Sequence, residues 1–185
     1  PILGANDGAS GVAVLLTLAE ILYALPPLNI GIDLLFVDGE DMGHSGDADK
    51  FGLGTQAFAK RVPEPAPQFA VCLDMVADKE QRFPIEYFSF QQAPQVVQAI
   101  WSLANDLGYS QFENKMGSAV IDDHYFLYKH AGIPAIDIID FEYPNAELNY
   151  WHTLQDIPEN CSAVSLEVVG TVVTHFIYQQ DLGYK

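Results

Sequence analysis

Three separate segments of the chain carry side chains that can bind a metal ion, each in a turn-rich setting. They contain Asp7, the acidic pair Glu40 and Asp41, and His152. Two carboxylates and one imidazole can bind zinc tetrahedrally and leave the fourth position open, as a catalytic site needs. A spare carboxylate beside the metal is a natural proton carrier. The residue types therefore favour a metal-dependent enzyme.

The elements that must position these side chains alternate between helices and short apolar strands. Helical spacing of apolar residues predicts helices over 10–25, 94–107 and 123–130, and a final helix with Ser162 as its N-cap. Apolar runs predict strands over 32–37, 68–75 and 134–139, and a strand or extended edge over 85–90. We interpret 38–54 and 141–150 as loops.

This alternation predicts an α/β three-layer sandwich with a mostly parallel central sheet flanked by helices. In such sheets ligands gather beyond the carboxyl ends of the strands. Acidic residues follow several of the predicted strands at that end: Glu40, Asp41, Asp74 and Asp140. These carboxylates therefore lie at the end of the predicted sheet where ligands gather.

The 185 residues, 49% of them hydrophobic, suit one domain over 1–185 with a sizeable core. The turn that contains Asp7 comes within seven residues of Pro1, without the preceding structure that would normally hold it. We therefore expect that the domain lacks its N-terminal portion.

The net charge of −17 excludes several classes of partner. It would repel the phosphate backbone of nucleic acids and an anionic membrane surface, but it would attract the α-ammonium group of a peptide. No apolar run reaches the length of a membrane span. The two cysteines, Cys72 and Cys161, form neither a disulfide framework nor a paired-cysteine zinc site.

Five short motifs in a fixed order resemble those of the zinc exopeptidase superfamily, in particular zinc aminopeptidases and animal-type glutaminyl cyclases. The motifs span nearly the whole chain and lie at 4–11, 38–41, 73–75, 122–124 and 151–153. Each motif is weak alone, whereas five in order are specific. An upstream His-x-Asp motif that the family usually carries is absent from this chain.

The resemblance implies that Asp7, Asp41 and His152 are the zinc ligands and that Glu40 is the general acid/base. Many relatives have Glu at the position of Asp41, so the loop backbone would have to come closer to the metal, because zinc–oxygen bonds are only about 2.0–2.2 Å long. On their residue types alone, Asp41 can equally be a turn or cap residue and Glu40 a solvated loop acid.

Two acids distinguish the two activities that the resemblance implies. In a two-metal aminopeptidase, Asp74 would bind the second ion together with an upstream histidine. In a cyclase with one zinc ion, Glu40, Asp74 and Asp122 would share protons. Asp122, where aminopeptidases often have Ser, and Trp151, which precedes the ligand histidine, favour the cyclase. The alternatives are that Asp122 caps a short helix and that Trp151 only packs.

The resemblance thus predicts a zinc-dependent glutaminyl cyclase that acts on the N-terminal glutamine of peptides or proteins and releases ammonia. Asp74 and Asp122 would orient the amide, and Trp151 would line the substrate pocket. The alternative is a zinc aminopeptidase with two metal ions, and a third possibility is an inactive relative that serves as a binding module. The family resemblance favours a secreted or periplasmic protein.

Overall fold

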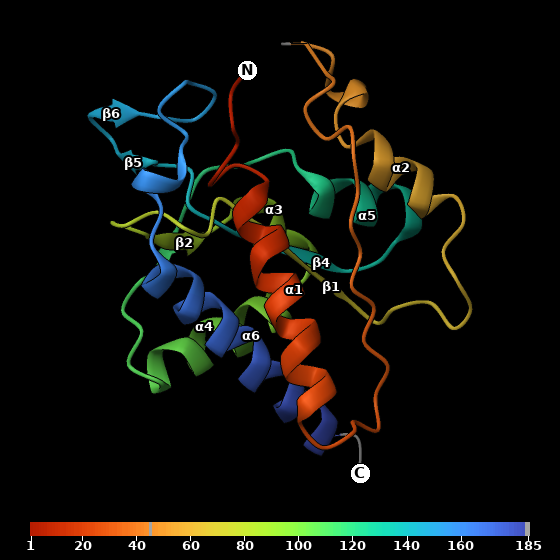
Figure 1. Cartoon of the computed structure of the whole chain (residues 1–185). Coiled ribbons are helices and arrows are strands. Elements are labelled where there is room, and N and C mark those ends of the chain that lie inside the picture. The colour runs from red at the N-terminus through yellow and green to blue at the C-terminus, as the bar shows by residue number, and fades with distance from the viewer. Residues whose placement is uncertain (45, 184–185) are drawn as a thin grey trace.

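Two pairs of parallel strands form the centre of the structure. The structure is a computed structural model, and it describes residues 1–44 and 46–183. β1 (Ala70–Asp74) pairs with β4 (Ala135–Ile139), and β2 (Phe83–Ile85) pairs with β3 (Phe112–Met116). β2 also contacts β4, so the two pairs are neighbours (Figure 1). The prediction of a mostly parallel sheet is confirmed.

Helices cover both faces of the β1–β4 pair. α1 (Ala9–Ala24) and α6 (Ala163–Gly183) pack against each other, α1 contacts β1, and α4 (Pro94–Asp106) packs on α6 (Figure 1). α5 (Asp123–Ala131) contacts β1 and β4, and α2 (Leu53–Ala59) packs against α5. The strands therefore lie between two sets of helices.

The alternation of side chains along β4 shows which residues face each layer. Ile136 and Ile138 belong to the core beneath α1, α4 and α6, whereas Ala135 packs with Leu127 of α5. Because successive strand residues point to opposite faces, Asp137 lies on the α5 side with Ala135. All five residues of β4 are buried, as expected for a strand covered on both faces. The three-layer α/β sandwich predicted from the sequence is confirmed.

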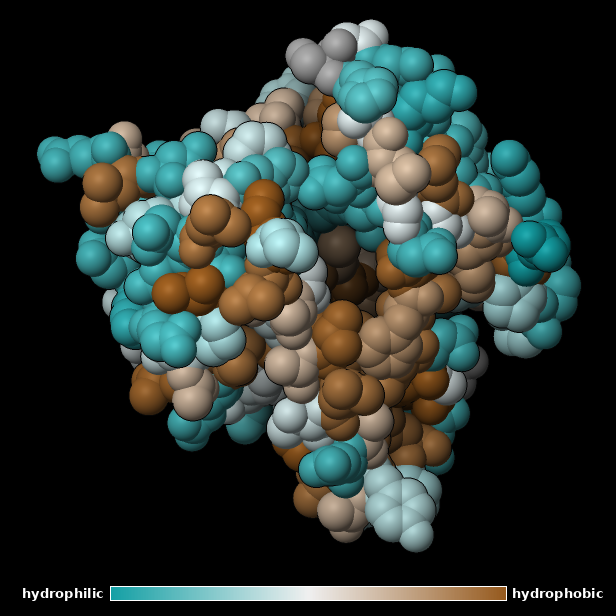
Figure 2. All heavy atoms as spheres, turned by 45° about the horizontal axis from the view of Figure 1, so that its top comes forward, coloured by the Kyte–Doolittle hydropathy of each residue, from teal (hydrophilic) through white to brown (hydrophobic). Residues whose placement is uncertain are grey.

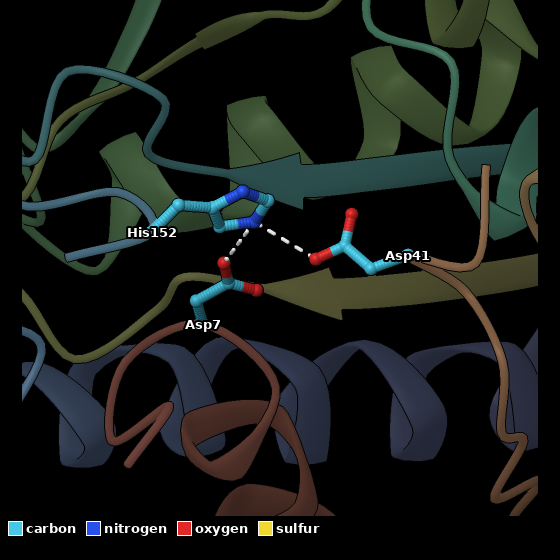
Figure 3. Close-up of side chains that lie close together, drawn as sticks. All are labelled: Asp7, Asp41 and His152. Carbon is cyan, nitrogen blue, oxygen red and sulfur yellow. Dashed lines mark ion pairs between the residues drawn. The ribbon is translucent and has the colours of Figure 1, made fainter. Parts of the chain in front are cut away.

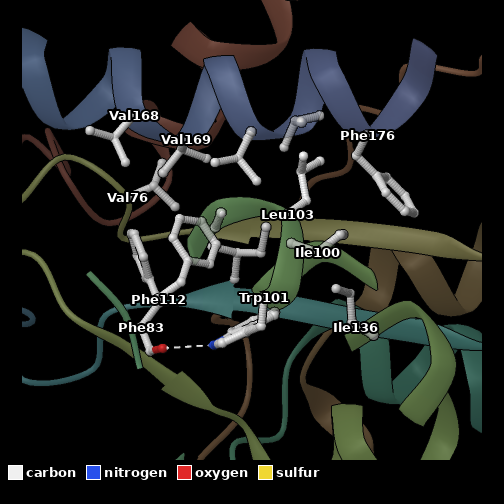
Figure 4. Packing of buried hydrophobic residues seen from close by; sticks show 14 of the residues in the cluster. Val76, Phe83, Ile100, Trp101, Leu103, Phe112, Ile136, Val168, Val169 and Phe176 are labelled. Atoms are coloured by element: carbon white, nitrogen blue, oxygen red, sulfur yellow. Dashed lines mark hydrogen bonds between the residues drawn. The ribbon is translucent and has the colours of Figure 1, made fainter. Parts of the chain in front are cut away.

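A cluster of aromatic rings joins α4 to the β2–β3 pair (Figure 4). Trp101 is 1% exposed, and its indole Nε1–H donates to the carbonyl oxygen of Phe83 at 3.0 Å. The rings of Phe83 and Phe112 lie 5.0 Å apart, and Phe112 also meets Trp101 edge to face. A buried indole thus has a partner for its one polar group, which avoids the cost of an unpaired donor.

The prediction of a strand over 32–37 is wrong for this structure. The segment is extended, but no strand is assigned there among the described residues. Ile32 and Leu34 pack against the main core, whereas Leu35, Phe36 and Val37 are exposed. Apolar residues alone do not make a strand, because the ladder needs a second chain segment alongside to accept and donate the backbone hydrogen bonds.

Two other segments also differ from their predictions. The predicted loop over 38–54 contains a 3₁₀ turn, η1 (Ala48–Lys50), and the start of α2, which sequence periodicity missed. The predicted strand over 85–90 ends at Ile85, and α3 (Tyr87–Gln92) follows. Glu86 starts that helix, because its carboxylate accepts the backbone N–H groups of residues 88 and 89.

The remaining elements agree with the predictions within a few residues. The predicted helices correspond to α1, α4, α5 and α6, and the strands at 68–75 and 134–139 correspond to β1 and β4. Ser162 lies immediately before α6, and its Oγ accepts the Ser165 N–H at 3.3 Å. The predicted loop over 141–150 contains a small antiparallel hairpin of β5 (Pro144–Asn145) and β6 (Leu148–Asn149), and η2 (Pro158–Asn160) follows it. β3 had no counterpart in the sequence prediction.

The surface combines a hollow with exposed apolar side chains. Figure 2 shows a face that is hollowed near its centre, with hydrophobic residues inside the hollow and below it. On α1, Leu16 is 57% exposed and Val12 43%.

Among the helices that the structure describes, none combines the length and apolar character that crossing a bilayer would require.

Candidate metal centre

Asp7, Asp41 and His152 converge on one point, although they come from three distant segments (Figure 3). Nε2 of His152 lies 3.0 Å from Oδ2 of Asp7 and 2.8 Å from Oδ2 of Asp41. One donor atom from each residue lies within 4.8 Å of the others. Asp41 thus reaches the cluster despite its short side chain.

The donor set suits a zinc ion. Zinc bonds of about 2.0–2.2 Å in a tetrahedral arrangement place two donor atoms about 3.4 Å apart. The two distances to His152, 3.0 and 2.8 Å, are shorter by a few tenths of an ångström. Small outward rotations of the three side chains would therefore open the space for a cation, with one nitrogen and two oxygen ligands.

A buried acid positions the turn that carries Asp7. The carboxylate of Asp156 is fully buried and accepts the backbone N–H groups of Asn6 at 2.7 Å and Asp7 at 3.2 Å. The Asn6 side chain in turn accepts the N–H of Ala77, and Ser10 Oγ accepts the N–H of Val76, just after β1. The turn is thereby tied to the carboxyl end of β1.

The short helix α2 positions the acidic pair. The backbone N–H groups of Gly52, Leu53 and Gly54 donate to the carbonyl oxygens of residues 40, 39 and 38, at 2.9–3.1 Å. A Cβ atom at Gly54 would lie 2.5 Å from the carbonyl oxygen of Asp38, so only glycine permits this approach. The loop that carries Glu40 and Asp41 is therefore anchored on a helix that the sequence prediction missed.

His152 is held in an unusual backbone conformation. Its φ of 89° lies in the left-handed region, which a side chain with a Cβ rarely adopts. Its ring stacks on Trp151, with centroids 3.9 Å apart and planes 21° apart, and Trp151 also packs against Phe141. Strained residues of this kind concentrate at functional sites. Trp151 is 36% exposed, so it lines the surface beside His152 rather than the core.

The acids predicted to be catalytic influence one another's ionisation. Burial, and then the charges of Asp122 and Asp41, raise the pKa of Glu40 to about 9. Burial, followed by the charges of Asp122, Asp7 and Glu40, raises the pKa of Asp74 well above its usual range. Burial also raises the pKa of Asp7 to about 6, against the opposing charge of His152. The structure thus brings Glu40, Asp74 and Asp122 together beside the candidate ligands.

Asp122 has a second, structural role. It is the N-cap of α5, and its Oδ1 accepts the Asp123 N–H at 2.5 Å. Its other oxygen, Oδ2, accepts from the thiol of Cys72 at 3.6 Å. Asp122 therefore caps α5 with one oxygen, as the alternative predicted, and its other oxygen remains available to the acid cluster.

Sequence reasoning missed Asp137 and Asp156, and both are fully buried. Asp137 is the cross-strand neighbour of Cys72, and one atom each of Cys72, Asp122 and Asp137 lies within 4.8 Å of the others. A lone aspartate inside the apolar strand at 135–139 was the available signal, because an acid is seldom buried without a specific role. Asp156 gave no such signal, since its partners are about 150 residues away.

The comparisons with known proteins identify the family of this chain. Residues 1–177 match the model of peptidase family M28. The chain belongs to this family. The M28 motifs that carry the candidate ligands all lie within the matched range.

The proteins that are similar to this chain include glutaminyl cyclases and exopeptidases. The chain is 23% identical to the glutaminyl-peptide cyclotransferase of Bothrops jararaca over 96% of its own length and 55% of that protein. A crystallised glutaminyl cyclase of Porphyromonas gingivalis is 37% identical, with a TM-score of 0.90 over 97% of this chain and 67% of that one. A Zn-dependent exopeptidase of Parabacteroides distasonis is also 37% identical, with a TM-score of 0.87 over 96% of this chain and 64% of that one. The chain thus spans about half of the cyclotransferase and about two thirds of the solved relatives.

Proposed function

We propose that this M28 chain forms part of a zinc-dependent glutaminyl cyclase, which converts the N-terminal glutamine of peptides to pyroglutamate. The observation that carries the proposal is the pairing of one three-donor set, Asp7, Asp41 and His152, with a group of partly or fully buried acids beside it. The likeness to bacterial and snake cyclases over nearly the whole chain supports it.

The metal role follows from the donor set. Asp7, Asp41 and His152 would hold the zinc ion. When bound, zinc supplies a Lewis acid for the side-chain amide carbonyl and a positive charge that favours ionised carboxylates nearby. The turn held by Asp156 and the loop anchored on α2 would keep two of the ligands in place.

The acids would manage the protons of the reaction. The α-amine of the substrate attacks the side-chain amide carbon, a C–N bond closes the five-membered ring, and the bond to the amide nitrogen breaks. Glu40 would take a proton from the α-amine and pass it to that nitrogen, which leaves as ammonia. Burial raises the pKa of Asp74 well above its usual range, which favours the protonated carboxyl, and in this form Asp74 would donate a hydrogen bond. Asp122 would orient the amide beside it.

Substrate binding would use charge and an exposed aromatic ring. The net charge of −17 would attract a positively charged peptide N-terminus. Trp151, beside His152 at the surface, would pack against the substrate. The expected partners are therefore peptide or protein N-termini, and a secreted or periplasmic location stays a prediction from the family resemblance.

Turnover of an N-terminal glutaminyl peptide, measured as ammonia release by the full-length zinc-loaded protein, tests the proposal. Glu40→Gln should lower kcat about 10²–10⁴-fold, because it removes the proton carrier and keeps the shape. Asp122→Asn should lower kcat while the helix stays capped, because asparagine is as good an N-cap as aspartate. Full activity in folded Glu40→Gln protein would refute the role of Glu40.

A two-metal aminopeptidase is the second candidate, favoured by the equal identity to the Parabacteroides exopeptidase. In that reading Asp74, at the carboxyl end of β1 and within electrostatic reach of Asp7, would bind a second ion. Two tightly bound zinc ions per chain and hydrolysis of a leucyl amide would support it. One zinc ion and cyclisation without that hydrolysis would exclude it.

A further inference from the structure

A second polar cluster lies deeper in the molecule, on the α5 side of β4. At its centre is Glu86, which is 2% exposed. Its carboxylate accepts the backbone N–H groups of Phe88, Ser89 and Val120, at 2.6–2.9 Å, and the Ser89 hydroxyl at 2.7 Å. Nε2 of His124 lies 3.0 Å from its Oε2. Five groups thus converge on one buried carboxylate.

These contacts determine that Nε2 of His124 is protonated. Burial raises the pKa of Glu86, but the hydrogen bond and charge of His124, followed by the backbone donors, outweigh it and lower the pKa to about 2. An ionised carboxylate can only accept hydrogen bonds. Nε2 of His124 therefore carries a hydrogen and donates it to Glu86.

The other ring nitrogen of His124 faces a second acid. Nδ1 lies 3.7 Å from Oδ2 of Asp137, and both side chains are completely buried. Within the described parts of the chain, neither Nδ1 nor either carboxylate oxygen of Asp137 has a hydrogen-bond partner. Unpartnered buried polar groups are rare and costly, about 1–3 kcal/mol each. A small approach of the two side chains would let one proton bridge Nδ1 and one oxygen of Asp137, while the other Asp137 oxygen stays available to Asp122.

Asp137 connects this pair to the candidate catalytic acids. It lies opposite Cys72 across the β1–β4 ladder, and the Cys72 thiol donates to Oδ2 of Asp122. One side-chain ligand atom from each of Cys72, Asp122 and Asp137 lies within 4.8 Å of the other two. A continuous set of contacts therefore runs from Glu86 through His124 and Asp137 to Asp122.

We infer that His124 is a positioning residue: anchored on Glu86 by Nε2, it holds Asp137 through Nδ1 and thereby fixes the carboxyl group that lies beside Asp122. Its catalytic consequence rests on the proposed cyclase function, whereas the proton between His124 and Asp137 does not. The ionisable groups around the His124–Asp137 pair come from three segments: Glu86 before α3, Asp122 and Asp123 at the start of α5, and Cys72 and Asp74 of β1. None of these five groups is basic.

Two substitutions separate the two ring nitrogens. In His124→Gln the amide reaches the place of Nε2 and can still donate to Glu86, but nothing replaces Nδ1. In His124→Asn the shorter amide replaces Nδ1 and leaves Glu86 with its four other donors. We expect His124→Gln to be the more stable variant, with kcat lowered about 10–100-fold at unchanged KM. His124→Asn should be less stable but retain more activity per folded molecule. Activity that follows stability in both variants would overturn the inference.

Spectroscopy of the full-length protein tests the shared proton independently of activity. The ¹⁵N shifts of the His124 ring should show hydrogen on Nε2, and the Nδ1 shift should change in Asp137→Asn. The infrared spectrum should contain a buried carboxylic-acid band that Asp137→Asn removes and His124→Gln shifts. An unchanged Nδ1 shift and an unchanged band in Asp137→Asn would refute the inference even if cyclisation is observed. The expected spectra in a protein that does not cyclise glutaminyl peptides would refute the proposed cyclase function alone.

Discussion

Helix α1 approaches the sheet closely at Gly11, and a single methyl group there should disturb both the fold and the metal centre. A Cβ atom at Gly11 would lie 2.0 Å from the carbonyl oxygen of Leu73 in β1 and 3.5 Å from its Cβ. Carbon–oxygen contacts are normally about 3.3 Å or longer. In Gly11→Ala, α1 would therefore have to move away from β1 by about 1.3 Å, given that contact distance.

The energy follows from two opposing effects. Alanine inside a helix is better than glycine by about 1 kcal/mol. Overpacking costs about 1–3 kcal/mol, and here the obstacle is backbone of a central strand, which cannot rotate away. The shift would also separate Val14 and Leu18, one and two turns further along α1, from the core beneath them. We expect a net loss in the free energy of unfolding of up to about 2 kcal/mol.

Gly170 offers a matched control on the facing helix. A Cβ atom there would meet only Cγ1 of Val14, at 3.9 Å, an ordinary contact. Gly170→Ala should therefore be neutral or stabilising by up to about 1 kcal/mol. Both variants add one methyl group inside a helix, in α1 for Gly11→Ala and in α6 for Gly170→Ala, so a difference between them reports on the approach of α1 to β1.

Urea denaturation followed by circular dichroism, and zinc affinity measured by competition with a chelator, check the prediction. Gly11→Ala should lower the urea midpoint and weaken zinc binding, because Asp7 precedes α1 by two residues and metal ligands tolerate displacements of only about 0.2 Å. Gly170→Ala should leave zinc affinity unchanged. If Gly11→Ala matches the wild-type chain in both measurements, the packing of α1 against β1 described above is wrong.

Two further predictions concern a positioning acid and the pH dependence. Asp156→Asn should weaken zinc binding about 10–100-fold, because asparagine has an NH2 group, which cannot accept a hydrogen bond, in place of one of the two carboxylate oxygens that accept the N–H groups of Asn6 and Asp7; unchanged affinity in a chelator competition would contradict this. The metal-free protein should become less stable in urea as pH rises from about 4 to about 9, since folded carboxyls with raised pKa hold protons that the unfolded chain releases. Those with values between about 6 and 9 are Asp7, Glu40, Asp78, Asp123 and Asp140. Each contributes a slope of up to about 1.4 kcal/mol per pH unit between its unfolded and folded pKa. The pKa of Glu86 is lowered to about 2, so Glu86 makes the free energy of unfolding rise with pH, but only below about pH 4.5. A stability maximum at alkaline pH would contradict the expected trend.

Local sequence patterns determined most of the elements and the identity of the candidate ligands. The helices at 94–106 and 123–131 and the strand at 135–139 were predicted from apolar spacing and punctuation, because those signals depend only on neighbouring residues. The resemblance of the motifs around Asp7, Asp41 and His152 to those of zinc exopeptidases implied the ligand set, and these are residue types that bind zinc.

Tertiary structure alone decided what supports those residues. The run at 32–37 has the composition of a strand, but strand formation depends on a neighbouring segment that composition does not reveal. α2 has only seven residues, which is too short for a clear helical period in the apolar residues. Backbone hydrogen bonds from residues 52–54 at its start position the loop that carries Glu40 and Asp41. The contacts of Asp156 with Asn6, and of His124 with Asp137, join residues far apart in the chain. The type of each side chain determines which chemistry it can perform. Its pKa and its position depend on burial and on partners distant in sequence, which only the folded chain brings together.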